Sequence, residues 1–277
     1  MATIREMVSA RYGTDIGAGG DTEAEGTIAE LLSRRSIRLY EDRPIDDDLL
    51  DVLLACAQSA PTKSNLQQYS IVVVQDKATR AKLAPFVPRT KSLPDVPGVL
   101  VFCADLRRGQ RVTGFRGKQH CNNNMDTFLN ATVDASLAMG FFVVAAEAAG
   151  LGCAPLSSLR DYMYQVAEVL ELPDGVFPVA GVMFGWPSAQ GYVNQRLPQS
   201  IVVHRERYDD SNLEAEIDGY DRTRDAAFPV PAEKQAKQDF FGTADFYGWS
   251  EHISRQLALP ERAEFRAFLK SHGFDLA

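Results

Sequence analysis

Runs of apolar residues alternate with polar turns along the chain, and they predict both helices and strands. Residues 27–33 place apolar side chains on one helical face, and a second helix should follow the acidic residues 46–48 and end near Pro61. The run 131–150 is apolar on nearly every face, which predicts a helix buried in the core. A further helix is expected at 161–170.

Short runs rich in β-branched and apolar residues predict buried strands at 71–74, 99–103 and 177–184, with a short fourth strand at 201–204. The charged segment 206–244 has few apolar clusters, and its secondary structure and role stay open. Residues 1–26 are polar and glycine-rich, which predicts a flexible N-terminal arm before one folded domain over 27–277.

The net charge of the chain argues against nucleic acids and anionic membranes as binding partners. A net charge of -8 and a pI near 5.1 leave no general positive field for nucleic acid or an anionic membrane surface. The apolar run 131–150 contains Asp134 and Glu147, which are costly in lipid, so we expect no membrane span. Four dispersed cysteines and an N-terminus without a signal peptide favour the reducing cytoplasm.

Several familiar motifs are absent from the sequence. No G-x-G-x-x-G connects a strand to a helix, and there is no Walker loop, no H-E-x-x-H and no G-x-S-x-G. The four histidines are too dispersed to predict a metal site. A Rossmann nicotinamide site and covalent hydrolysis are therefore both disfavoured.

A basic tract follows the first predicted helix. Arg34, Arg35, Ser36 and Arg38 put three guanidinium groups and a hydroxyl within five residues, and such groups form the charge-assisted hydrogen bonds that a phosphate needs. Two interpretations are open: a phosphate site, or a solvated basic patch at the end of a helix.

Three more polar segments follow in order. Residues 60–67 form a turn rich in hydroxyls and amides before a strand, suited either to a flat heteroaromatic ring or to a simple connection. Residues 150–160 combine glycines, which allow close backbone approach, with serines able to cap a helix near Leu159. Gly185-Trp186-Pro187 is followed by a loop that carries Arg196.

In this order, the four segments resemble the FMN-dependent nitroreductases, and in particular the branch of large oxygen-insensitive NADPH nitroreductases and NADPH flavin reductases. The resemblance runs from about Ile28 to the C-terminal helix. It implies an α+β fold with a mixed sheet flanked by helices, in an interlocked homodimer whose two chains build the FMN site. The all-round apolar run 131–150 suits such a dimer, although burial within one chain is the alternative.

The resemblance also implies roles for individual residues. Cofactor contacts are expected from the basic tract, the amide turn, the segment after Gly152 and the late loop: Arg34, Arg35, Ser36, Arg38, Ser64, Asn65, Gln67, Leu156, Ser157, Ser158 and Arg196. Two departures stand out, because Asn194 replaces a lysine common in relatives and Ser157-Ser158 replaces a usual Gly-Gly.

The implied reaction is ping-pong hydride transfer from NADPH or NADH through flavin N5 to a nitroaromatic, quinone or flavin acceptor, with no catalytic side chain because FMN performs the chemistry. The physiological acceptor and the choice between NADPH and NADH stay open. So do two alternatives: an FMN-dependent dehydrogenase or oxidase of a dedicated metabolite, and a flavin-binding protein without turnover.

Overall fold

The computed structural model describes residues 2–88, 90 and 93–277. The chain divides into two compact units, a first one of Met1–Arg34 and Tyr192–Glu261 and a second one of Arg35–Gly191 and Arg262–Ala277. The prediction of a single domain over 27–277 stays a prediction.

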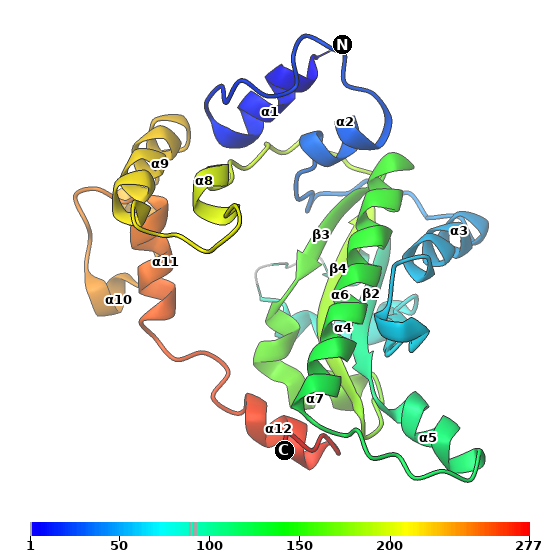
Figure 1. The fold of residues 1–277 in the computed structure, drawn as a ribbon. Coiled ribbons are helices and arrows are strands. Elements are labelled where there is room, and N and C mark those ends of the chain that lie inside the picture. Colours follow the sequence, from blue (N-terminus) through cyan, green and yellow to red (C-terminus); the bar gives the residue numbers. More distant parts are fainter. Residues whose placement is uncertain (1, 89, 91–92) are drawn as a thin grey trace. The chain divides into compact units, whose positions relative to one another are not determined.

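Within the described residues, the second unit is built on a four-stranded sheet in the order β1-β2-β4-β3 (Figure 1). The strands are β1 (Tyr69–Val73), β2 (Gly98–Asp105), β3 (Gly152–Leu156) and β4 (Val176–Gly185). All three strand pairs are antiparallel, and an isolated parallel bridge joins Ser36 to Cys153 at the β3 edge. The α+β class and the strands expected at 71–74, 99–103 and 177–184 are confirmed, whereas the four strands themselves form an antiparallel sheet and the only parallel pairing described is that isolated bridge.

The central strand β2 is buried on both faces. Leu100, Phe102 and Ala104 join one hydrophobic cluster, while Val99 and Val101 join the other. This alternation follows from the two-residue period of a strand. Helices α3 (Asp47–Gln58), α6 (Met125–Ala148) and α12 (Phe265–Ser271) supply the first cluster, and α4 (Lys77–Leu83) supplies the second. Helices therefore cover both faces, as expected.

Helix α6 is the predicted core helix, and it packs on all four strands of the sheet. It begins earlier than expected because Asn124 caps it, its side-chain oxygen accepting from Thr127 N at 2.9 Å. Alanines at positions 131, 135 and 138 let the helix approach the sheet, and Phe142 packs edge-on against Phe184 at 4.9 Å. The helix is long and apolar enough to cross a membrane, but its buried face is part of the core.

Two predictions about local structure need correction or refinement. The segment 150–160, for which no strand was predicted, contains the strand β3, which tolerates Pro155 because it lies at the edge of the sheet and needs fewer ladder donors. The helix expected at 161–170 is present as the 3₁₀ turn Ser158–Tyr162 followed by α7 (Met163–Val169). Helix α5 (Arg107–Phe115) was not predicted.

The first unit is helical throughout its regular elements in the described residues. These are α1 (Ile4–Tyr12), α2 (Gly26–Ser33), α8 (Gln199–Val202), α9 (Leu213–Ala227), α10 (Gln238–Phe241) and α11 (Trp249–Leu257). The strand predicted at 201–204 is wrong, because Pro198 at the N-cap leads into α8 and the chain becomes extended only at Val203. Helix α1 lies inside the segment predicted as a flexible arm.

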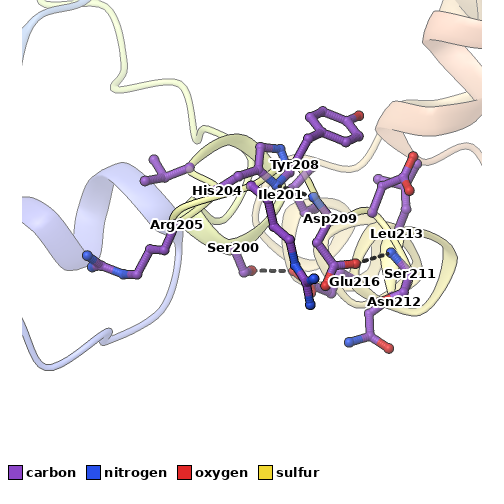
Figure 2. A pocket seen from close by; sticks show the side chains of 13 residues that line it. Ser200, Ile201, His204, Arg205, Tyr208, Asp209, Ser211, Asn212, Leu213 and Glu216 are labelled. Carbon is purple, nitrogen blue, oxygen red and sulfur yellow. Dashed lines mark hydrogen bonds between the residues drawn. The ribbon is translucent and has the colours of Figure 1, made fainter.

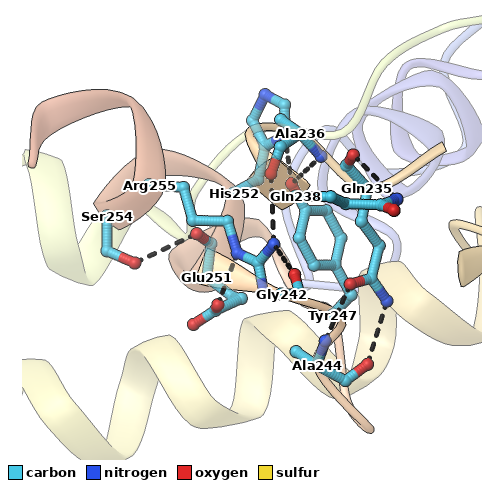
Figure 3. Close-up of polar contacts among 10 residues, drawn as sticks. All are labelled: Gln235, Ala236, Gln238, Gly242, Ala244, Tyr247, Glu251, His252, Ser254 and Arg255. Atoms are coloured by element: carbon cyan, nitrogen blue, oxygen red, sulfur yellow. Dashed lines mark hydrogen bonds and ion pairs between the residues drawn. The ribbon is translucent and has the colours of Figure 1, made fainter. Parts of the chain in front are cut away.

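The part of 206–244 that follows α9 is ordered around a buried arginine (Figure 3). The Arg255 guanidinium, 3% exposed, donates to the carbonyls of Ala236 (3.1 Å) and Gly242 (2.7 Å) and to the Glu251 carboxylate (2.6 Å). The Gln235 side chain bonds both the N–H and the carbonyl of Ala244. Polar contacts therefore replace the apolar periodicity that the sequence lacks here.

The packing of α6 predicts a large loss of stability for Phe142→Ala. Removing a fully buried ring from contact with Phe184 should lower the free energy of unfolding by about 3–5 kcal/mol. Phe115→Ala is the matched control, because Phe115 is 70% exposed. Urea unfolding followed by circular dichroism measures both variants, and equal losses would contradict the core role of Phe142.

Candidate functional site

The second unit holds most of the basic tract against the β3 edge of the sheet. Ile37 N donates to Cys153 O at 3.0 Å, beside the parallel bridge from Ser36. The Arg35 guanidinium binds Gln190, through its Nε to the carbonyl and through Nη2 to the side-chain oxygen at 2.9 Å. Arg38 is exposed. The tract is thus an ordered, cationic rim on the sheet.

Close packing fixes the backbone of this tract. A Cβ on Gly152 would lie 2.6 Å from the Cβ of Ile37, so only glycine lets the two segments approach this closely. The Tyr40 hydroxyl lies 2.6 Å from Ile37 O and 3.2 Å from Met183 O. Burial raises the pKa of this hydroxyl, which therefore stays protonated and able to donate at neutral pH.

The amide turn has an unusual backbone. Ser64, Asn65 and Gln67 all have positive φ, at 50°, 56° and 50°. Such conformations cost free energy in residues with a side chain and tend to occur at functional sites. All three side chains are exposed, and Gln67 Nε2 donates to Asn65 Oδ1 at 3.2 Å. The turn therefore presents hydroxyl and amide groups to the outside.

Two charged residues that the sequence interpretation missed hold this turn in place. Asp134 of α6 is 1% exposed, and its carboxylate accepts from Lys63 N at 3.2 Å and from Gln68 N at 3.0 Å. The Arg108 guanidinium donates to Gln67 O at 2.7 Å. An acid in the middle of an apolar helix was the available signal, because a buried carboxylate requires nearby donors.

A cavity of about 480 Å³ adjoins the turn. Besides Asn65 and Leu66, it is lined by Arg108, His120 and Asn124 among others. The walls thus combine charged groups of both signs, carboxamides and aliphatic groups, a mixture suited to a polar aromatic molecule.

The segment Leu156–Ser158 lies at the end of β3. Leu156 is buried and pairs with Gly181, whereas Ser157 is exposed. Ser157 precedes the 3₁₀ turn, but its side chain makes no capping hydrogen bond, so the expected cap is wrong. The N-cap conformation is helical here, which points the hydroxyl away from the orphan N–H groups.

Arg34 and Arg196 belong to the first unit, where the N-terminal helix α1 brings their segments together. The buried Arg11 guanidinium donates to Arg34 O at 2.7 Å and to Asn194 O at 3.1 Å. Arg196 is exposed, and its Nη1 lies 3.4 Å from the same Asn194 carbonyl oxygen.

The tract and the amide turn do not meet within one chain. They lie at opposite edges of the sheet, since the turn leads into β1 and the tract borders β3, about 14 Å away across three strand spacings. Along the strands, Tyr69 is level with Phe177 through Ala104, whereas Cys153 pairs with Phe184. Seven residues of β4 separate these two levels, so the turn and the tract are also offset by about 23 Å along the strand direction.

A separate cavity of about 420 Å³ lies in the first unit between α8 and α9 (Figure 2). Its wall includes Asp209, whose backbone N donates to His204 Nδ1 at 3.3 Å, and Glu216, which accepts from the Ser200 hydroxyl. The carboxylates here interleave with Arg205 and Arg207. None of the residues expected to bind a cofactor lines this cavity.

Comparison with known proteins covers both halves of the chain. The sequence model of the Nitroreductase family matches residues 31–186, and that of its C-terminal domain matches residues 194–277. The chain is 35% identical to the FMN reductase (NAD(P)H) of Bacillus subtilis strain 168, covering 70% of this chain and 79% of that protein. It is 29% identical to the oxygen-insensitive NADPH nitroreductase of Salmonella typhimurium, covering 90% and 98%.

Solved structures agree with these sequence matches. The structure of NfrA2 from B. megaterium superimposes with a TM-score of 0.81 at 33% identity, covering 92% of this chain and all of that one.

The anchoring of the turn predicts that Asp134→Asn loosens it. The amide nitrogen would face a backbone N–H that now lacks its acceptor, which should lower the free energy of unfolding by about 1–3 kcal/mol. Hydrogen exchange of the peptide covering 60–69 should speed up. Asp51→Asn is the control, because Asp51 is an exposed acid of α3 that lies outside the turn. Unchanged exchange in Asp134→Asn would contradict the anchoring role.

Proposed function

The chain belongs to the nitroreductase family, and on this premise we propose that it is an FMN-dependent oxidoreductase that uses NADPH or NADH to reduce small-molecule acceptors. Relatives of similar length named as FMN reductase and as NADPH nitroreductase support this proposal. The observation that carries it is that the chain contains both an ordered cationic tract at one edge of the sheet and an exposed amide turn with positive φ angles at the other edge.

The residues of the tract fit the phosphate end of FMN. A phosphate carries close to two negative charges at neutral pH, and guanidinium groups bind it through forked hydrogen bonds. Arg35, Ser36 and Arg38 supply such donors at the β3 edge, and Arg34 and Arg196 supply them in the first unit. Glycine at 152 and 191 keeps side chains away from this backbone.

The amide turn fits the ring end of the cofactor. Bound FMN supplies the redox chemistry, in which a hydride arrives at the ring and leaves it again. Ser64, Asn65 and Gln67, together with the backbone near Leu156, Ser157 and Ser158, would orient the ring through hydrogen bonds. N–H donors at the ring edge stabilise negative charge that develops during hydride transfer. No side-chain acid is needed.

A single site that takes the nicotinamide donor and the acceptor in turn predicts ping-pong kinetics. NADPH or NADH binds first and departs before a nitroaromatic, quinone or free flavin takes its place. We expect this enzyme to work in the cytoplasm, where reducing conditions keep cysteines as thiols.

We further propose that the working form is a homodimer. Helix α6 exposes an apolar stripe on the side away from the sheet, consisting of Met125, Leu129, Val133, Leu137 and Phe141. Its spacing of four residues puts the stripe along one face of the helix, and water-exposed apolar stripes of this kind mark protein interfaces. A second chain would also bring a β1 edge to a β3 edge, which one chain does not do by itself.

The proposed activity is tested by absorbance spectroscopy. Protein mixed with FMN should show a bound-flavin spectrum that bleaches with NADPH or NADH under anaerobic conditions and returns on adding a nitroaromatic or a quinone. If the protein binds FMN but NADPH and NADH do not bleach the flavin spectrum, it is a flavin-binding protein without turnover. Bleaching only by an organic donor would identify a dedicated dehydrogenase or oxidase. A missing flavin spectrum would contradict the proposal itself.

The proposed dimer is tested by Leu137→Asp. A carboxylate in the middle of the apolar stripe should convert the protein to a monomer in sedimentation experiments, because burying an unpaired charge is costly. FMN affinity should fall by about tenfold or more, since each site would lose half of its residues. Leu257→Asp, at an 80% exposed position of α11, is the control and should stay dimeric. A dimeric Leu137→Asp variant would exclude α6 as the interface.

A further inference from the structure

The N-terminal helix α1 lies outside the family match, which begins at residue 31. Arg11 stands in its last turn and is 8% exposed, an unusual position for a guanidinium in a surface helix. A buried cation must be matched by acceptors, and here the acceptors are backbone carbonyls of segments distant in sequence.

The Arg11 guanidinium reaches three of these carbonyls. Its Nη2 donates to Leu32 O and Arg34 O, both at 2.7 Å, and its Nη1 donates to Asn194 O at 3.1 Å. Leu32 and Arg34 stand at the C-terminal end of α2, where carbonyls lack helical partners and the dipole favours a cation. The planar fork of arginine serves acceptors in several directions at once, which the single ammonium of lysine does less well.

Further contacts fix Arg196 relative to Arg11. The backbone N of Arg196 donates to Arg11 O at 2.9 Å, and the Tyr220 hydroxyl donates to Gln195 O at 3.2 Å. Gly13 ends α1 with φ at 71°, and a Cβ there would lie 2.3 Å from Gln195 Nε2. The end of α1 and the segment 194–196 are therefore in direct contact, and the positive φ at Gly13 favours glycine there.

This arrangement concentrates positive charge. Arg11 and Arg196 both direct a guanidinium nitrogen at the Asn194 carbonyl oxygen, at 3.1 and 3.4 Å. Two like charges that converge on one neutral acceptor repel each other, and an anion bound beside the exposed Arg196 would relieve that repulsion. The surroundings of Arg196 thus favour a multiply charged anion such as a phosphate monoester.

We propose that Arg11 is a positioning residue for the cofactor phosphate: from a helix that precedes the family domain, it fixes Arg34 and Arg196 for binding the phosphate monoester of the flavin. This inference rests on the proposed function, in which both arginines contact that phosphate. The N-terminal helix α1 is then a structural part of the cofactor site.

The test compares FMN with riboflavin, which has the same ring and ribityl chain but no phosphate. Dissociation constants for both ligands are measured by flavin fluorescence quenching for the full-length protein and for Arg11→Met, Arg11→Lys and Arg5→Met. In Arg11→Met, the preference for FMN over riboflavin should fall by about tenfold, with riboflavin affinity little changed. Arg11→Lys keeps the positive charge but not the planar fork of donors, so in this variant the preference for FMN over riboflavin should fall by about threefold.

Arg5→Met is the matched control, because Arg5 lies on the same helix in an exposed pair with Asp15. Its preference for FMN should equal that of the unmodified protein. An unchanged preference in both Arg11 variants would overturn the inference, and so would an equal loss of affinity for FMN and riboflavin, which would indicate a purely structural role. If Arg11→Met does not fold, the preference of Arg11→Lys decides.

The proposed function can fail separately from this inference. An unmodified protein that binds riboflavin as tightly as FMN would have no phosphate site, and both proposals would fall. An unmodified protein that prefers FMN, alongside Arg11 variants that keep the preference, would leave the proposed function standing and remove only the role of Arg11.

Discussion

The packing of α6 across the four-stranded sheet is the constraint on which the second unit depends. Alanines on its buried face allow the close approach, and the same approach buries the Asp134 carboxylate, which then has to find donors in the turn between α3 and β1. The positive φ angles of that turn are maintained by a core interaction, because Lys63 and Gln68 are both tied to one carboxylate. The opposite face of the helix carries the apolar stripe, so one element supports the core, the turn and the proposed interface.

The secondary structure that sequence alone predicted was the part governed by local apolar periodicity. Strands β1, β2 and β4 and the helices α2, α3 and α6 were found because their patterns are dense and regular. Strand β3 was missed because Gly152 and Pro155 weaken its pattern, and 201–204 was misassigned because its β-branched residues outweighed the influence of Pro198. The segment after α9 was beyond prediction, since Arg255 and Gln235 order it through side-chain contacts with backbone groups.

The chemistry proposed for the candidate site came from residue types, whereas its geometry could not be predicted. Residue types in the tract and the turn allowed phosphate and ring binding, and the resemblance to the family selected those interpretations, which stay predictions. Their location at opposite edges depends on the strand order β1-β2-β4-β3, which no local pattern encodes. Contacts such as that of Arg11 with Asn194, 183 positions apart, likewise arise only from the tertiary fold.

The separation of tract and turn across the sheet has a genetic consequence. In a homodimer whose sites each combine the tract of one chain with the turn of the other, a chain damaged only in its tract and a chain damaged only in its turn would together form one intact site and one doubly damaged site. Two such alleles would complement each other within a cell, whereas two alleles damaged at the same edge would not. In such a homodimer, the sheet topology would therefore divide harmful substitutions into two complementation groups.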